Sequence, residues 1–191
     1  MTTKKLILDM IETAREISAE PSTYWTDQLN NADSITGYYS LGEEIWEQTG
    51  GKVDAFVHSV GTAASSRGVA TALKRHNPDL KLVVVEPAES AVLSGGQPGP
   101  HKIEGVGIGY TPPLWDRELV DEIIPVTTAD AMAMARRLAR EEGLFAGTSS
   151  GANVVAALQV AERLGPDASI VTLMADSGMK YLSTAVYGTD Q

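Results

Sequence analysis

Short apolar runs, each followed by a turn and then a helical pattern, limit what this chain can fold into more than any other feature. The run Val53–Ser59 leads through a Gly-Thr-Ala-Ala-Ser turn into a helical pattern over Ser65–His76. The next run, Lys81–Pro87, is apolar without alternation, which is typical of a strand buried on both faces. Strands that alternate with helices predict an α/β fold with a doubly wound, mostly parallel sheet.

The same reading places the remaining elements along the chain. The expected strands are Val53–Ser59, Lys81–Pro87, Glu122–Val126 and a buried Ser169–Gly178, with a short β-rich run at Thr23–Thr26. The expected helices are an opening helix closed by Pro21, Thr36–Gln48, Ser65–His76, Thr128–Glu142 with Thr127 or Thr128 as its N-cap, one entered through Ala146–Asn153, and Met179–Val186. Residues 1–191 contain no repeat or linker and are predicted to form a single domain.

Composition excludes several classes of function. A formal net charge of -10 disfavours nucleic acid and anionic membranes as partners, because both attract basic surfaces. The absence of cysteine excludes disulfides and thiolate chemistry, and the three histidines lack metal-ligand spacing, so we expect no metal site. No apolar run approaches the ~20 residues of a membrane span, and the start does not resemble a signal peptide. We therefore expect a cytoplasmic protein.

Turns rich in glycine and serine follow the predicted strands. They lie at Gly61–Ser65, Ser94–Gly109 and Asp176–Gly178. Ligands of parallel sheets gather at the carboxyl ends of the strands, so these turns predict a binding site. At Gly61–Ser65, backbone N–H groups and the positive end of a helix would suit an anion, although neither a P-loop nor a G-x-G-x-x-G pattern is present. The alternative is a tight turn in which Ser65 is only the N-cap.

Two further segments allow both a structural and a chemical interpretation. In Ala146–Asn153, Ser149 and Ser150 are N-cap candidates, or one serine hydroxyl bonds a neutral ring nitrogen of a ligand. The glycines of Gly105–Gly109 would let the backbone approach a flat ligand closely, or would only make the loop flexible.

Several motifs in a fixed order resemble one enzyme family. They are GEEIWEQTGGKVDAFVHSVGTAAS, VVVEP, GPHKIEGVGIGYTP, EEGLFAGTSSGA and SGMKYLST. In this order they resemble cysteine synthase (O-acetylserine sulfhydrylase) and the related catalytic core of cystathionine β-synthase, which are fold type II pyridoxal-phosphate enzymes. The resemblance extends from near Lys4 to about Tyr187.

This resemblance assigns roles to particular residues. It implies that the anion is the phosphate of pyridoxal 5′-phosphate, held by Gly61, Thr62, Ala63, Ala64 and Ser65. It further implies that Ser149 meets the pyridine nitrogen, that Gly105 flanks the cofactor, and that Gln28 helps hold the substrate carboxylate. The two alanines stand where the family has glycines, which would cost ~1 kcal/mol or more at any position that needs a positive φ.

The resemblance also implies that part of the family's machinery lies outside this chain. The family's Schiff-base lysine, its Ser/Thr-Ser-Gly-Asn loop and its asparagine at the ring oxygen have no match here. We therefore expect a C-terminal, cofactor-anchoring domain without its lysine-bearing N-terminal domain. Such a chain would hold no catalytic residue, would bind the cofactor weakly or not at all, and would be inactive alone.

Three functions remain open from the sequence. The first is the anchoring domain of a β-replacement enzyme that joins an O-activated serine, its amino-acid substrate, to a sulfur nucleophile. The second is a non-catalytic module that pairs with a complete subunit, and the third is a domain that binds another phosphorylated small molecule. In each case we expect a homodimer or small oligomer, because the face for the missing domain would be uncovered.

Overall fold

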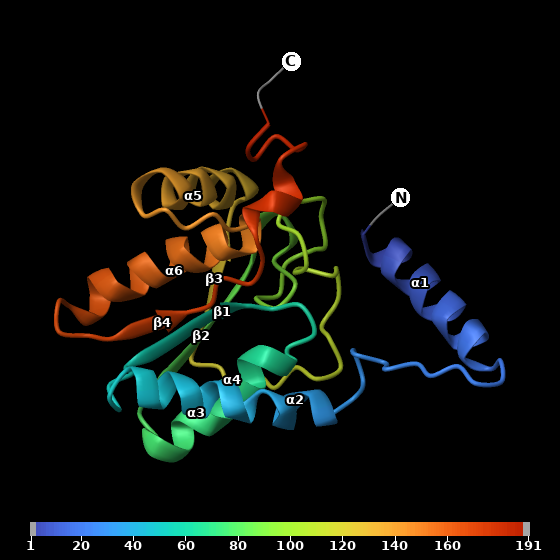
Figure 1. Ribbon diagram of the computed structural model, residues 1–191, viewed down its shortest axis with the longest axis horizontal. Helices are drawn as coiled ribbons and strands as arrows, with labels where there is room; N and C mark the ends of the chain where they lie inside the picture. The colour runs from blue at the N-terminus through green and yellow to red at the C-terminus, as the bar shows by residue number, and fades with distance from the viewer. Residues whose placement is uncertain (1–2, 189–191) are drawn as a thin grey trace.

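A parallel sheet in the order β3-β2-β1-β4 forms the centre of the computed structural model, which describes residues 3–188 (Figure 1). The strands are β1 (Ala55–Ser59), β2 (Lys81–Pro87), β3 (Glu122–Val126) and β4 (Ile170–Thr172). The helices are α1 (Thr3–Ser18), α2 (Asp33–Gly37), α3 (Tyr39–Gln48), α4 (Ala64–His76), α5 (Thr128–Glu141) and α6 (Thr148–Leu164), with 3-10 helices η1 (Ala88–Ser90) and η2 (Gly178–Tyr181). Every strand pair is parallel, which confirms the predicted α/β fold.

Helices cover both faces of the sheet. Alternate residues of β1 and β2 point to opposite sides, so Phe56 and Val84 join one core while Val57 and Val85 join the other. The first core also contains residues of α2, α3 and α4, and the second contains residues of α5 and α6. Burial on both faces explains why these strands are apolar without alternation.

The winding direction reverses at β1. The chain passes from β1 to β2 and β3 in one direction along the sheet, and then returns to place β4 on the other side of β1. Ligands of open α/β sheets bind outside the carboxyl ends of the strands at such a reversal. The turn that follows β1 therefore lies at the position where this topology favours a ligand.

Local sequence explains the edge strand and the helix after it. Pro125 cannot donate a ladder hydrogen bond, and it lies exposed in β3 at the edge of the sheet. Thr127 is the N-cap of α5, since its hydroxyl oxygen accepts a hydrogen bond from the Asp130 N–H at 3.0 Å. Thr127, one of the two predicted cap residues, is thus confirmed.

Two predictions for the first third of the chain are wrong. The run Thr23–Thr26 forms no strand, because it does not pair with the sheet. The helix predicted over Thr36–Gln48 is divided into α2 and α3 at Tyr38, whose N–H bonds the carbonyl of Ile35, three residues back. The preceding Gly37 is a weak helix former, which favours a break there.

The C-terminal elements are shorter than predicted. The buried strand expected over Ser169–Gly178 is reduced to the half-buried β4. Beyond the end of β4, the Ser59 N–H of β1 donates to the Asn153 side chain and not to a neighbouring strand, so the pairing stops there. The helix expected over Met179–Val186 is only the 3-10 helix η2. There the carbonyl of Tyr181 accepts from both the N–H and the hydroxyl of Thr184, which closes a tight turn.

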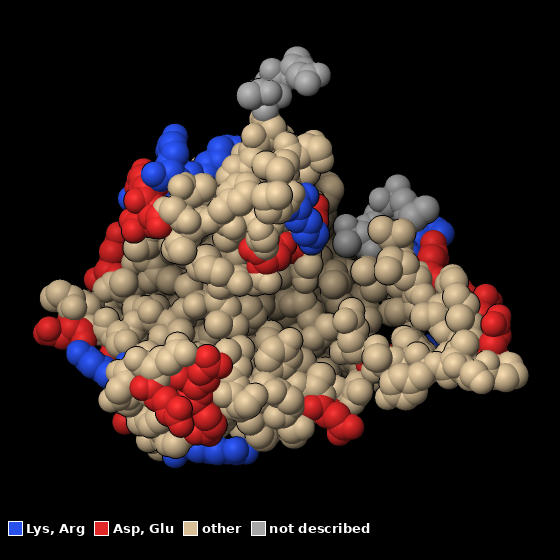
Figure 2. Space-filling model, in the orientation of Figure 1, with Lys and Arg blue, Asp and Glu red and all other residues tan. Residues whose placement is uncertain are grey.

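Helix α1 lies to one side of the sheet and is joined to α2 by residues 19–32 (Figure 1). Its half-buried side includes Ile7 and Ile11, which line a groove with Trp25 and Leu29. Acidic side chains gather over the α3 corner of the face drawn in Figure 2, in keeping with the negative net charge. Among the described residues, no helix is long and apolar enough to cross a membrane.

Candidate functional site

The turn between β1 and α4 presents hydrogen-bond donors at the beginning of a helix. The first helical bond of α4 runs from the Arg67 N–H to the Ala63 carbonyl at 3.0 Å, so the N–H groups of residues 64–66 have no partner within the helix. One of them, that of Ala64, donates to the Thr62 hydroxyl at 3.3 Å. Ser65 is not the N-cap, because Ala63 occupies that position. The donors and the positive helix end suit an anion.

Ala63 adopts a backbone conformation that alanine rarely adopts. Its φ of 72° lies in the left-handed region, where a non-glycine residue costs about 1–2 kcal/mol. Its neighbour Ala64 is the first residue of α4 and carries no such strain. The cost expected for replacing glycine therefore applies to the first alanine only.

The glycine loop that follows β2 packs directly against the turn after β1. A Cβ atom on Gly61 would lie 2.6 Å from the carbonyl oxygen of Gly105, so no side chain fits between them. The N–H of Gly107 donates to the carbonyl of Val60 at 3.2 Å, and Gly105 itself has a φ of 79°. The structure thus brings Gly61 and Gly105, two predicted site residues, into contact.

The beginning of α6 joins the same region. Its N-cap is Gly147, so neither Ser149 nor Ser150 caps the helix as the sequence suggested. The Thr148 hydroxyl accepts from the Glu104 N–H at 3.2 Å, which ties α6 to the Gly105 loop, and Ser150 accepts from the Ala175 N–H at 3.0 Å. Ser149 is buried, and its hydroxyl makes no hydrogen bond to the described residues.

Asp176 and Tyr181 support the beginning of α6. The Tyr181 hydroxyl donates to Asp176 Oδ2 at 2.7 Å, and burial together with this carboxylate raises the pKa of Tyr181. Lys180 Nζ lies 3.5 Å from Asp176 and 3.4 Å from Glu104. A Cβ atom on Gly147 would collide with Asp176 Oδ1, a buried oxygen without a hydrogen-bond partner among the described residues.

His58 lies behind the turn, at the end of β1, and sequence reasoning assigned it no role. Its Nε2 is 3.0 Å from the Ser65 hydroxyl, and its Nδ1 is 3.4 Å from Asn153 Nδ2. Burial lowers the pKa of His58 to about 4, so the ring is neutral at physiological pH. A histidine in an otherwise apolar buried strand was the signal that could have drawn attention to it.

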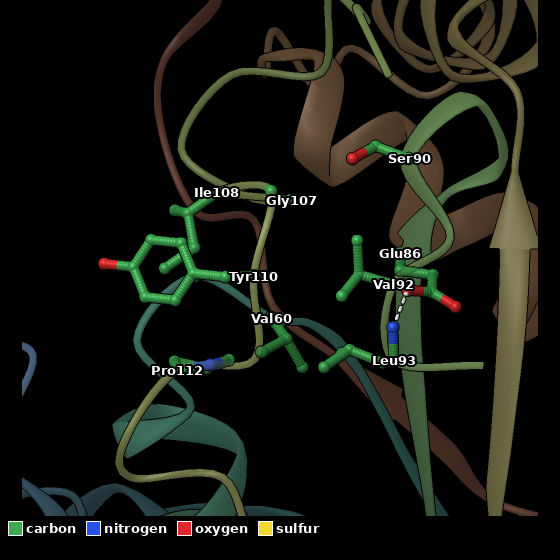
Figure 3. Close-up of a pocket in the computed structure, with 11 residues that line it drawn as sticks. Val60, Glu86, Ser90, Val92, Leu93, Gly107, Ile108, Tyr110 and Pro112 are labelled. Atoms are coloured by element: carbon green, nitrogen blue, oxygen red, sulfur yellow. Dashed lines mark hydrogen bonds between the residues drawn. The ribbon is translucent and has the colours of Figure 1, made fainter. Parts of the chain in front are cut away.

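A small cavity of about 10 Å³ lies on the other side of the turn, between Val60 and the end of β2 (Figure 3). The buried carboxylate of Glu86 accepts from the N–H groups of Leu93 and Ser94 at 2.7 and 3.0 Å, which fixes the start of the loop. Ser90 also lines this space, and its hydroxyl is buried without a partner among the described residues. The volume admits about one water molecule and no larger ligand.

Gln28, the predicted substrate-binding residue, lies in a different place. It is exposed and lines the groove that Ile7 and Met10 of α1 share with Leu29. None of the residues that line this groove belongs to the turn after β1. Its role toward a substrate stays a prediction.

Comparison with known proteins places these features in a family. The model of the family described as pyridoxal-phosphate dependent enzyme matches residues 5–176. A cysteine synthase of Staphylococcus aureus is 42% identical over 182 residues, which are 94% of this chain and 59% of that protein. Cysteine synthase 3 of Caenorhabditis elegans is 44% identical over 169 residues, which are 87% of this chain and 50% of that protein.

Solved structures agree with these sequence relatives. An O-acetyl serine sulfhydrylase, isoform 3, of Entamoeba histolytica superposes with a TM-score of 0.87 at 40% identity, covering 95% of this chain and 55% of that one. An O-acetylserine dependent cystathionine beta-synthase of Helicobacter pylori gives 0.88 at 35% identity, with 93% and 58% covered. The chain thus spans between half and three fifths of the length of these relatives. The extent of the family match, together with the fold, shows that the chain belongs to the pyridoxal-phosphate dependent enzymes and is similar to their cysteine synthases.

Proposed function

We propose that this chain is the cofactor-anchoring domain of a cysteine-synthase-like enzyme, which replaces the leaving group of an O-activated serine with a sulfur nucleophile. The observation that carries the proposal is the turn after β1. There the N–H groups of residues 65 and 66 have no partner within α4 and lie in the same turn as the hydroxyls of Thr62 and Ser65. Gly61 of this turn contacts the Gly105 loop, and Thr148, the neighbour of Ser149, ties that loop to the beginning of α6.

The donor set fits the phosphate of pyridoxal 5′-phosphate. Backbone amides at a helix N-terminus and neutral hydroxyls bind phosphate without a lysine, and the neutral His58 behind them adds no charge. Ser149 is the candidate partner of the pyridine nitrogen, because the residue is largely buried and its hydroxyl makes no hydrogen bond to another described residue. When bound, the cofactor supplies the electron sink for chemistry at Cβ of an amino acid.

We expect the reaction to need a lysine from a further segment of protein. Lys180, on η2, is engaged by Glu104 and Asp176. Lys102 is exposed on the surface of the loop after β2. Neither lysine is therefore both buried and unpaired, the setting in which lysines act as general bases or form Schiff bases. The 191-residue chain alone is expected to bind cofactor weakly and to lack β-replacement activity.

We further expect association with a lysine-bearing N-terminal domain, with a complete subunit, or with a second copy of the chain. Apolar side chains are exposed near the candidate site, among them Met174, Met179 and Leu182. On α1, Leu6 and Met10 are also exposed, beside the half-buried side of the helix. Surfaces of this kind tend to be covered by a partner. The cytoplasmic location stays a prediction.

The first experiment tests binding at the turn. Pyridoxal phosphate and inorganic phosphate are titrated separately into the chain and into two variants by calorimetry. Ser65→Asp should abolish binding of both, because its carboxylate repels the phosphate. Ser149→Ala should weaken pyridoxal phosphate and leave inorganic phosphate unchanged, since only the cofactor has a ring. Unchanged affinities in Ser65→Asp would refute the site.

The second experiment tests activity. Formation of cysteine from O-acetylserine and sulfide is measured for the chain alone and with the part of the Staphylococcus aureus relative that this chain does not match added in trans. No turnover alone and turnover with the added part is the expected result. Turnover by the chain alone would contradict the proposed need for a lysine. Phosphate binding without any gain from the added part would favour the module that binds another phosphorylated molecule.

A further inference from the structure

We propose that His58 acts as a positioning residue, whose fixed tautomer donates to Ser65 and thereby directs the Ser65 hydroxyl proton toward the anion bound at the turn. The inference rests on the proposed function, because it deepens the account of the same phosphate site. It stands on a chain of three side chains, Asn153, His58 and Ser65, that links α6 through β1 to the beginning of α4.

The orientation of the Asn153 amide is fixed by two backbone groups. The N–H of Ser59 donates to Asn153 Oδ1 at 2.8 Å, which identifies that atom as the oxygen. Asn153 Nδ2 donates to the carbonyl of Leu173 at 3.1 Å, which identifies it as the nitrogen. A flipped amide would face a donor with a donor and an acceptor with an acceptor, so only one orientation satisfies both bonds.

This orientation selects the tautomer of His58. The Asn153 nitrogen faces His58 Nδ1 at 3.4 Å, and an amide nitrogen can only donate. Nδ1 must therefore carry the lone pair, and in the neutral ring the proton is on Nε2. Deep burial in a pocket shared with the Phe56 ring keeps the imidazole from taking up a second proton.

The tautomer then determines what Ser65 can do. His58 Nε2–H donates to the Ser65 oxygen over 3.0 Å, so the Ser65 hydroxyl proton remains available to donate to another acceptor. In the opposite tautomer the hydroxyl would have to donate to Nε2 and would offer the anion only its lone pairs, which repel it. The Asn153 amide thus determines, through His58, that the turn presents a hydroxyl donor to a phosphate.

The first test reads the tautomer directly. A long-range proton–nitrogen correlation spectrum of the ¹⁵N-labelled chain at pH 7.5 distinguishes protonated from unprotonated ring nitrogens in each of the three histidines. The signals that disappear in His58→Phe belong to this residue. We expect a proton on Nε2 and none on Nδ1, with or without phosphate. A proton on Nδ1, or on both nitrogens, would overturn the proposal whatever the chain binds.

The second test is a double-mutant cycle read by affinity for inorganic phosphate. Ser65→Ala should weaken binding roughly tenfold or more, as expected for the loss of a hydrogen bond to a charged group. Ser65→Thr restores a hydroxyl at the same position and should recover most of the affinity that Ser65→Ala loses. His58→Phe should weaken binding about threefold, because the hydroxyl is released to sample its three staggered positions.

The cycle separates positioning from structural support. In the Ser65→Ala background, His58→Phe should have no further effect on phosphate affinity, since there is no hydroxyl left to orient. An equal loss in both backgrounds would mean that His58 acts on the fold of the turn, which overturns the proposal. A parent chain that binds neither phosphate nor pyridoxal phosphate would refute the proposed function as well, while the tautomer spectrum would still report on His58.

Discussion

Replacing Ala63 by glycine tests whether the turn after β1 is strained. Ala63 has a φ of 72° and is 3% exposed, whereas the adjacent Ala64 is 2% exposed and begins α4. The two positions therefore differ in backbone conformation but hardly in burial. The substitutions Ala63→Gly and Ala64→Gly remove the same methyl group from nearly equal surroundings, which makes each the control for the other.

The expected changes in free energy of unfolding follow from three contributions. Losing the buried methyl costs about 0.8 kcal/mol at each position. The added conformational freedom of glycine in the unfolded chain lowers stability by a further amount of about 0.4–1 kcal/mol. Only at Ala63 does glycine also relieve left-handed strain of about 1–2 kcal/mol. We expect Ala63→Gly to be nearly neutral and Ala64→Gly to destabilise by about 1–2 kcal/mol.

Urea unfolding followed by circular dichroism measures both values under the same conditions. Equal m-values for the two variants would show that both expose the same surface on unfolding, so that their midpoints compare stability directly. Equal losses of stability in both variants would refute the assignment of strain to Ala63. A loss larger at Ala63 than at Ala64 would contradict it more strongly.

Three further predictions concern stability and can be measured by the same unfolding assay. Gly61→Ala should destabilise by about 1–3 kcal/mol, because its Cβ would lie 2.6 Å from the backbone of Gly105; no loss would contradict that contact. Burial lowers the pKa of His58 from 6.5 to about 4, so the unfolded chain takes up a proton at higher pH than the folded chain does. The free energy of unfolding should therefore fall by about 3 kcal/mol from this residue as the pH drops from 6.5 to 4. His58→Phe should flatten this pH dependence, and an unchanged dependence would contradict the lowered pKa of His58. Tyr181→Phe should cost about 1.5–3 kcal/mol, since it removes a donor from the Asp176 carboxylate, and a neutral result would show that the bond contributes little.

Patterns of burial made most of the sheet predictable from the sequence. The continuous apolar run of β2 predicted a buried strand, and the alternation of strands with helices predicted a parallel sheet; the structure has both. The end of β4 was not predictable, because it depends on the side chain of Asn153, which lies outside the strand and replaces a ladder hydrogen bond of Ser59. Such a contact between residues 94 positions apart leaves no local signal.

The turn and the loop that form the candidate site were predictable, but the strained backbone of Ala63 and the contacts of His58 were not. Glycine patterns indicated the turn at Gly61 and the loop at Gly105, and the structure places the two in contact. The left-handed φ of Ala63 could not be read from an alanine, a residue that normally avoids that conformation. The role of His58 depends on partners from two helices, so spacing along the sequence could not reveal it.

Titration of the ¹⁵N-labelled chain with pyridoxal phosphate, followed by backbone amide spectra, tests whether the turn after β1 holds the phosphate of the cofactor. We expect saturable shifts in the amides of residues 62–66 and of Gly105. Inorganic phosphate should shift only the amides of residues 62–66, whereas the cofactor should also shift the amide of Ser149. Shifts confined to another surface, such as the hollow beside Arg136 and Arg140, would contradict this phosphate site.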